Sequence, residues 1–276
     1  MPFAMIGFVC ALTLGLTEMP DTRSWAILLL QVVGCMVFAR NVAMGFNRWA
    51  DRNIDKANPR TADREIPAGV ISPGKALAFV VVNALLFIIA AATINPLTGW
   101  LSPVALAVVM FYSYCKRFTA LAHLVLGLSL GIAPLGAYIA VTGTVDTAIL
   151  WLSLLVMTWC GGFDIIYALQ DAEFDRSNGL HSIPARFPAR TALAISIIMH
   201  IISAAALLMF ASCLPQGWLL WTGCAIFISL LVLQHILVTP AKQRNIGIAF
   251  GTLNGLASLV LSIFVILQLV IYNFLQ

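Results

Sequence analysis

Residues 40–69 read RNVAMGFNRWADRNIDKANPRTADREIPAG, and the rest of the chain is best interpreted from this stretch. Asn47, Asp51 and Asp55 recur here at steps of four, which places side chains on one face of an α-helix. The preceding residues 25–39 are almost wholly apolar, as expected for a segment that enters a membrane. Carboxylates at the end of such a segment are costly unless they are paired or bind a cation. The stretch is therefore a candidate functional site.

The composition of the whole chain indicates a membrane protein. Of its 276 residues, 61% are hydrophobic and only 9% are charged, and the mean hydropathy is +0.98. A soluble domain carries about 25% charged residues, so a water-soluble domain is excluded. The six cysteines are scattered through apolar runs without a CxxC pair, which predicts small core residues. The net charge of +4 does not indicate nucleic-acid binding, and nothing indicates an obligate protein partner.

Nine apolar segments are long enough to form helices, and Pro, Gly or charged residues separate them. We predict an all-α membrane protein with nine transmembrane helices, in a single domain that covers residues 1–276. The first segment has no basic residues before it, so it is predicted to be a span and not a signal peptide. The predicted segments are 2–18, 24–48, 74–94, 98–114, 120–140, 147–169, 191–212, 217–238 and 246–273.

The positive charges predict the orientation of these segments. Of the 15 Lys and Arg residues, 13 fall in the loops after the second, fourth, sixth and eighth segments. Loops rich in Lys and Arg stay on the cytoplasmic side of a membrane. We therefore expect a multi-pass protein of the cytoplasmic (inner) membrane, with these loops and the N-terminus inside and the C-terminus outside.

A second acidic cluster ends the sixth apolar segment. Asp164, Asp171 and Asp175 are separated by seven and then four residues, which again gives one helical face. Asp171 and Asp175 also lie 120 positions after Asp51 and Asp55. This constant offset predicts two parallel four-helix repeats plus one extra helix at the start of the chain. The predicted repeat units are about 24–140 and 147–273.

Two facing acidic clusters of this kind predict a site for a metal-bound diphosphate. Carboxylates alone would repel one another, whereas Mg²⁺ prefers a few carboxylates together with phosphate oxygens and water. Arg64, Lys116 and Arg117 flank the clusters in the predicted loops and can complete the charge balance around the diphosphate oxygens. Each of these basic residues, and Arg60 as well, could equally serve only to fix the topology.

At these two clusters the chain resembles the UbiA-type intramembrane aromatic prenyltransferases. That family carries an NDxxDxxxD-like first motif and a DxxxD second motif, often preceded by Tyr-Ala. Here residues 47–55 read NRWADRNID and residues 167–175 read YALQDAEFD. Arg48 stands where many members have an acid. The chain also opens abruptly at Pro2, without the lead-in that members often have, as expected if its start is assigned too far downstream.

The resemblance implies Mg²⁺-dependent transfer of a polyprenyl group from polyprenyl diphosphate to a ring carbon of an aromatic acid, in quinone biosynthesis. The loops NPRTADREIPAG (58–69) and NGLHSIPARFP (178–188) look most like members that act on 4-hydroxybenzoate. The alternative acceptor is 1,4-dihydroxy-6-naphthoate, in the futalosine route to menaquinone. The implied metal ligands are Asn47, Asp51, Asp55, Asp171 and Asp175. The implied diphosphate-binding residues are Arg60, Arg64, Lys116, Arg117 and His181, although a lone loop histidine is more often solvated.

Three further residues are candidates for the catalytic chemistry. Arg40 lies seven residues before Asn47, about two turns deeper on the same face, and could bind the carboxylate of the acceptor. Its alternative role is to pair with Asp164 for structure alone. Asp164 is also a candidate base. Tyr167 could hold the diphosphate or line the reacting carbon, or simply pack as an amphipathic side chain.

Two other classes of membrane protein fit the sequence less well. A transporter with an intramembrane acidic relay would place its acids nearer the midplane, often within inverted repeats. A phosphatidyl-alcohol transferase would show a long Asp-Gly and Ala-Arg pattern before its later acids, which this chain lacks. Parallel acidic clusters at one membrane face favour the prenyltransferase.

Overall fold

The computed structural model describes residues 2–16, 22–240 and 245–274. Every regular element within these ranges is helical. The long helices are α2 (Thr22–Ala50), α4 (Pro73–Ile94), α5 (Pro96–Cys115), α6 (Ala122–Thr142), α7 (Thr147–Ala168), α10 (Ala189–Ser212), α11 (Trp218–Leu237) and α12 (Asn254–Phe274). The short ones are α1 (Pro2–Cys10), η1 (Ala11–Gly15), α3 (Arg52–Ala57), η2 (Leu169–Asp171), α8 (Ala172–Ser177), α9 (Ile183–Arg186) and η4 (Ile248–Leu253).

Eight of the nine predicted segments form helices that are long and apolar enough to cross a membrane, counted over the described residues. The first predicted segment forms a shorter apolar helix, Pro2–Gly15. Its 14 residues rise about 21 Å, less than the roughly 30 Å of a hydrocarbon core. The end of that predicted segment, residues 17–18, lies outside the described ranges. So do Lys242 and Arg244, two of the charges used to predict the orientation.

The boundaries of the long helices follow from capping residues. Ser72 and Asn95 each accept a hydrogen bond from a backbone N–H of the helix that follows, and each is followed by Pro at the first helical position. Proline fits there because that N–H has no helical partner. Asp146 caps α7 in the same way, after Gly143 ends α6 with a positive φ of 67°. These local signals make tight joints between neighbouring spans.

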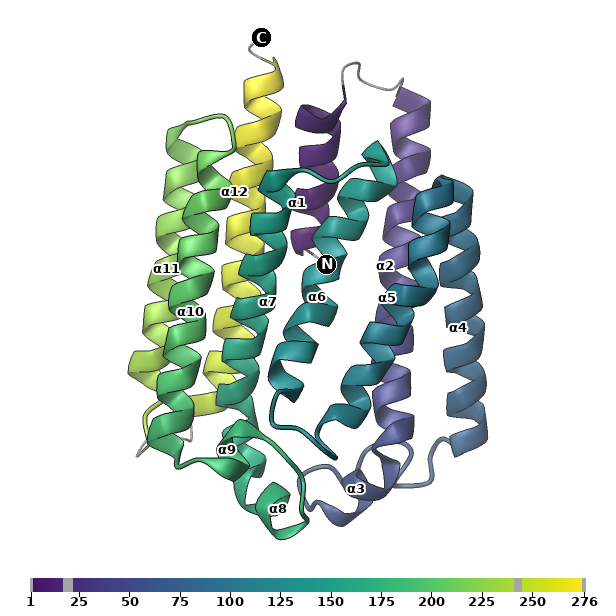
Figure 1. Ribbon diagram of the computed structural model, residues 1–276, viewed down its shortest axis with the longest axis vertical. Coiled ribbons are helices and arrows are strands. Elements are labelled where there is room, and N and C mark those ends of the chain that lie inside the picture. The colour runs from purple at the N-terminus through teal and green to yellow at the C-terminus, as the bar shows by residue number, and fades with distance from the viewer. Residues whose placement is uncertain (1, 17–21, 241–244, 275–276) are drawn as a thin grey trace.

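The spans form two groups in space (Figure 1). Helices α2, α4, α5 and α6 pack in one group, and α7, α10, α11 and α12 in the other. Contacts between α6 and α7 join the groups, and α1 contacts both α6 and α12. At the α6–α7 contact, an added Cβ at Gly127 would come within 2.1 Å of the carbonyl oxygen of Met157. Glycine is required there for the two backbones to approach.

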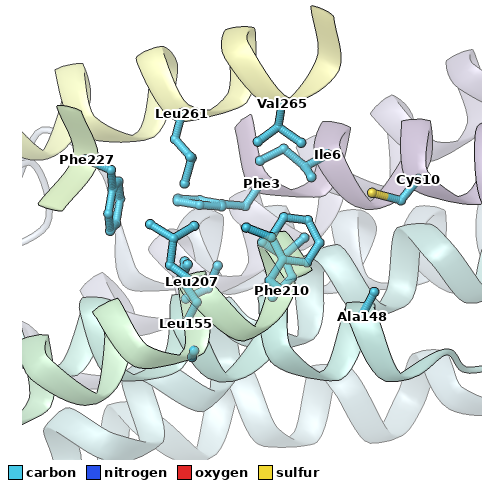
Figure 2. Packing of buried hydrophobic residues seen from close by; sticks show 14 of the residues in the cluster. Phe3, Ile6, Cys10, Ala148, Leu155, Leu207, Phe210, Phe227, Leu261 and Val265 are labelled. Carbon is cyan, nitrogen blue, oxygen red and sulfur yellow. The ribbon is translucent and has the colours of Figure 1, made fainter. Parts of the chain in front are cut away.

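The largest apolar core lies among α1, α7, α10, α11 and α12 (Figure 2). Phe3 of α1 contacts the Trp159 ring at 5.2 Å and the Phe227 ring at 6.4 Å, measured between centroids. Fully buried side chains from the other helices, including Phe210 and Leu261, complete the cluster. This packing fixes α1 against the second group of helices. The short helices α3, α8 and α9 lie at one end of the bundle, opposite the C-terminus (Figure 1).

Candidate active site

The two acidic clusters interrupt their helices in the same way. Asp51 separates α2 from α3 with φ −90° and ψ 2°, and Asp171 precedes α8 with φ −105° and ψ 2°. Both α3 and α8 have six residues, and they begin 120 positions apart. Backbone hydrogen bonds from Asp51 to Asn47 (2.9 Å) and from Asp55 to Asp51 (2.8 Å) continue across the first break. The predicted helical face therefore persists, although the helix itself is not continuous.

Asp51 lies buried between two basic residues of the segment after α5. Its carboxylate contacts Lys116 Nζ at 2.6 Å and Arg117 Nη2 at 3.1 Å. The Asn47 side chain donates to the same carboxylate at 3.2 Å. Burial raises the pKa of Asp51, and the two basic groups oppose that shift. Asp51, a predicted metal ligand, is therefore paired with Lys116 and Arg117, which are two of the predicted diphosphate-binding residues.

Asp55 is also buried, and it has one free oxygen. Its Oδ1 accepts a hydrogen bond from Arg64 Nη1 at 2.7 Å. Its Oδ2 is buried and has no hydrogen-bond partner among the described residues. A buried carboxylate oxygen without a partner is costly, which marks this atom as a candidate ligand for a cation.

The second cluster is held by the loop that follows the first. Arg60 forms a two-pronged pair with Asp171, which also accepts from Asn58 Nδ2 at 3.0 Å. Arg60 Nη1 donates to the Tyr167 hydroxyl at 2.8 Å. The hydrogen bond to Asp171 raises the pKa of Arg60 further above its ordinary range. Phe250, in the π-helical turn η4, stacks on the Tyr167 ring at 4.1 Å between centroids. Arg60 thus connects the two helical groups.

The remaining acids, Asp164 and Asp175, have partners that were not predicted from the sequence. Asp175 accepts a hydrogen bond from the Ser182 hydroxyl at 2.9 Å. Asp164 pairs with His123 Nδ1 at 2.7 Å, and not with Arg40. The signal that could have identified His123 is an ionisable residue inside the apolar segment 120–140. Asn58 and Ser182 carry no comparable signal, because polar residues are ordinary in loops.

A polar cavity of about 200 Å³ lies between the clusters. Eleven of the thirteen predicted site residues line it: Asn47, Asp51, Asp55, Arg60, Arg64, Lys116, Asp164, Tyr167, Asp171, Asp175 and His181. Arg117 reaches the site through its contact with Asp51. Arg40 does not line this cavity, and its side chain is exposed. Tyr112, Ser113 and His123 are lining residues that were not predicted.

The donor atoms around this cavity suit Mg²⁺, although the basic residues occupy most of them. Within the described ranges, no three acidic, histidine or cysteine side chains converge on one point as a ready metal site. Carboxylate and amide oxygens are nevertheless the ligands that Mg²⁺ takes, and it completes its shell with water and phosphate oxygens. The unpartnered Oδ2 of Asp55 is one such donor. The residues present therefore fit the ion.

The sequence pattern of the UbiA prenyltransferase family matches residues 4–256. The chain belongs to this family. It is 33% identical over 235 residues to the 4-hydroxybenzoate octaprenyltransferase of Yersinia enterocolitica, covering 84% of this chain and 77% of that one. Membership confirms the expectation from the two motifs and favours an enzyme over a carrier.

Solved UbiA structures share the fold. The apo structure of a UbiA homolog from Aeropyrum pernix K1 superposes with a TM-score of 0.81 and 29% identity, over 98% of this chain and 95% of that one. A UbiA homolog from Archaeoglobus fulgidus, bound to GPP and Mg²⁺, superposes with a TM-score of 0.64 at 17% identity, over 95% of each chain. The second likeness bears on the fold alone.

Proposed function

We propose that this UbiA family member transfers a polyprenyl group from polyprenyl diphosphate to a ring carbon of an aromatic acid, with Mg²⁺, in quinone biosynthesis. The acceptor that we propose is 4-hydroxybenzoate. The observation that carries the proposal is the meeting of two acidic clusters and four basic residues around one cavity at the end of the bundle. The name of the Yersinia relative supports the choice of acceptor.

The four basic residues supply the charge that a diphosphate needs. Arg60, Arg64, Lys116 and Arg117 each contact an aspartate now, and each can turn to phosphate oxygens when a metal takes over the aspartate. The residues that would hold Mg²⁺ are Asn47, Asp51, Asp55, Asp171 and Asp175. When bound, Mg²⁺ neutralises charge that develops on the leaving diphosphate. His181 lines the same cavity and is proposed as a further contact to the diphosphate.

The prenyl tail is proposed to lie in a second cavity, which is almost wholly apolar. This cavity has a volume of about 290 Å³ and lies among α2, α4, α5 and α6. On α2 its lining residues run from Val32 to Ala39, and the polar cavity begins eight residues later at Asn47. That separation is about 12 Å along the helix. A tail there avoids contact with water, which favours binding.

The chemistry then follows from where the charges lie. The allylic C–O bond breaks, and its electron pair leaves with the diphosphate, held by the basic residues. A ring carbon next to the phenolic hydroxyl forms the new C–C bond. The ring proton displaced at that carbon passes to the carboxylate of Asp164, which lines the cavity about two turns deeper than Asp171. Tyr167 lines the cavity between these acids and holds Arg60 in place.

Arg40 is proposed to bind the acceptor carboxylate. It lines neither cavity but lies between them along α2, next to Ala39 of the apolar cavity and about two turns before Asn47 of the polar cavity. Its side chain is exposed, and no ion pair involves it within the described ranges. A guanidinium without a competing partner can bind a carboxylate through two hydrogen bonds. This role would orient the ring toward the allylic carbon.

The proposed orientation places the site at the cytoplasmic face of the inner membrane. The C-terminus lies at the opposite end of the bundle from α3 and α8, and is therefore proposed to be outside (Figure 1). α1 begins part-way along the bundle and runs toward that same outer end (Figure 1), and the N-terminus is proposed to lie on the inner side. We also propose that the single domain consists of two related four-helix units, residues 24–140 and 147–273.

One assay tests the function. Membranes that contain the protein are incubated with Mg²⁺, geranyl diphosphate and 4-hydroxybenzoate, and the product mass and released diphosphate are measured. A parallel reaction with 1,4-dihydroxy-6-naphthoate separates the two acceptors. We expect a prenylated acid that is lost in EDTA and in Asp55→Asn. No diphosphate release with either acceptor, or release unaffected by EDTA, would refute the proposal.

A further inference from the structure

His123 is a buried histidine whose two ring nitrogens both have partners. It is the second residue of α6 and is 3% exposed. The backbone N–H of Ile183, at the start of α9, donates to His123 Nε2 at 3.3 Å. His123 Nδ1 lies 2.7 Å from Asp164 Oδ2. Three segments that are distant in sequence therefore meet at one imidazole.

These contacts determine which nitrogen carries the proton. Nε2 faces an N–H group, so it must offer a lone pair and cannot itself carry a hydrogen. The ring proton is then on Nδ1, which donates it to Asp164. With both nitrogens engaged, His123 has no free atom for a substrate. It can act only through the carboxylate that it holds.

We propose that His123 is a positioning residue for Asp164 in the proposed reaction. It donates from Nδ1 to Oδ2 and leaves Oδ1 of the carboxylate for the ring proton. The proton transferred is the one displaced when the ring carbon bonds to the allylic carbon, while the C–O electron pair leaves with the diphosphate. A carboxylate fixed through one oxygen loses less freedom when it accepts that proton. This inference rests on the proposed function.

The partner on the other side of His123 extends the arrangement to the diphosphate end. Three consecutive residues contact three parts of the site: the His181 N–H donates to the Lys116 carbonyl at 2.7 Å, Ser182 donates to Asp175, and Ile183 donates to His123. The same short segment thus fixes a metal-motif acid and the histidine behind the base. Because Ser182 and Ile183 are adjacent in the chain, they fix how far Asp175 lies from His123.

The experiment compares three variants of the full-length protein. His123→Leu removes both hydrogen bonds. His123→Gln keeps an amide N–H for Asp164 and a carbonyl for Ile183, so it is the conservative rescue. His200→Leu is the matched control, because His200 is a membrane histidine of similar burial (4% exposed) that pairs with His235 outside the cavity.

With Mg²⁺, geranyl diphosphate and 4-hydroxybenzoate, we expect His123→Leu to lower kcat about 30- to 100-fold. KM for geranyl diphosphate should change less than threefold, and His123→Gln should recover at least a third of kcat. In an Asp164→Asn background, His123→Leu should have no further effect on kcat. A kcat for His123→Leu equal to that of His200→Leu, or additive effects with Asp164→Asn, would overturn the proposal.

A second measurement does not depend on turnover. The protein is labelled with ¹⁵N-histidine in micelles without metal, and the His123→Gln spectrum identifies the His123 signal among the four histidines. We expect the His123 proton on Nδ1 and an unprotonated Nε2. A proton on Nε2 would overturn the proposal. If wild type transfers no prenyl group to either acceptor, the proposed function fails, and this spectrum still tests the hydrogen-bond arrangement.

Discussion

The pair between Arg64 and Asp55 provides the sharpest test of the site. The Asp55 side chain is 5% exposed and that of Arg64 is 27% exposed, and their contact is 2.7 Å. Arg64→Ala leaves Asp55 with neither oxygen bonded to a side chain of the described residues, among which its Oδ2 already lacks a partner. Breaking a buried pair costs about 3–5 kcal/mol. Because Arg64 is partly solvated, we expect a loss of about 2–4 kcal/mol in the free energy of unfolding.

The measurement is reversible unfolding in mixed micelles by titration with SDS, in EDTA and then in millimolar Mg²⁺. Mg²⁺ should stabilise Arg64→Ala more than wild type, because in wild type it has to displace the arginine. Arg48→Ala is the matched control, since its pair with Glu65 spans 3.8 Å with side chains 34% and 58% exposed. That exposed pair should contribute at most about 1 kcal/mol.

Two results would refute this reasoning. A loss for Arg64→Ala no larger than the loss for Arg48→Ala would show that Asp55 is not held as a buried charge. Equal stabilisation of wild type and Arg64→Ala by Mg²⁺ would show that the ion does not use Asp55. The first outcome concerns the ion pair and the second concerns the metal, so the two inferences fail separately.

Three further predictions concern other parts of the molecule. Asp171→Asn removes the negative charge that pairs with Arg60 and that is proposed to bind the metal, and should lower kcat/KM for geranyl diphosphate at least about 100-fold. A decrease of less than fivefold would argue against a role of Asp171 in catalysis. Tyr167→Phe removes the acceptor of one Arg60 N–H, and should raise KM for geranyl diphosphate about three- to tenfold with little change in kcat. A lower kcat with an unchanged KM would instead indicate a role at the reacting carbon. Gly127→Ala places a Cβ within 2.1 Å of the Met157 carbonyl oxygen and should destabilise the fold by about 1–3 kcal/mol. The control Gly255→Ala, which has open space around it, should be neutral or slightly stabilising. Similar SDS midpoints for the two variants would contradict the close α6–α7 contact.

The spans and the two motifs could be predicted because their signals are local. Hydropathy gives the helix positions, and a spacing of four gives the shared face of Asn47, Asp51 and Asp55. The break at Asp51 was not predicted, although Asp is a common first cap of a helix. Here the Asp51 carboxylate makes no capping hydrogen bond, because Lys116 and Arg117 occupy its oxygens.

The cross-chain partners could not be predicted, because periodicity says nothing about which neighbour packs against a face. Arg60 and Asp171 are 111 residues apart, and His123 and Asp164 are 41 apart. From the sequence alone, Arg60 could serve only to fix the topology, and His123 lies within the apolar segment 120–140 with no predicted role. Only the packing of α6 against α7, and the contacts of the 58–69 loop with η2 and the end of α7, resolve them.

The pairing of Asp51, Asp55 and Asp171 with Lys116, Arg117, Arg64 and Arg60 gives the resting protein its own counterions. A cluster of bare acids at a membrane face would attract stray cations between turnovers. Internal pairing avoids this. Under the proposed function, it also makes entry of the substrate an exchange of charges, in which the acids would hold the metal while the freed bases would bind the diphosphate. Each exchange breaks internal ion pairs, so we expect the ion and the diphosphate to bind more tightly together than either does alone. When diphosphate departs, the internal pairs can close again without help from solvent.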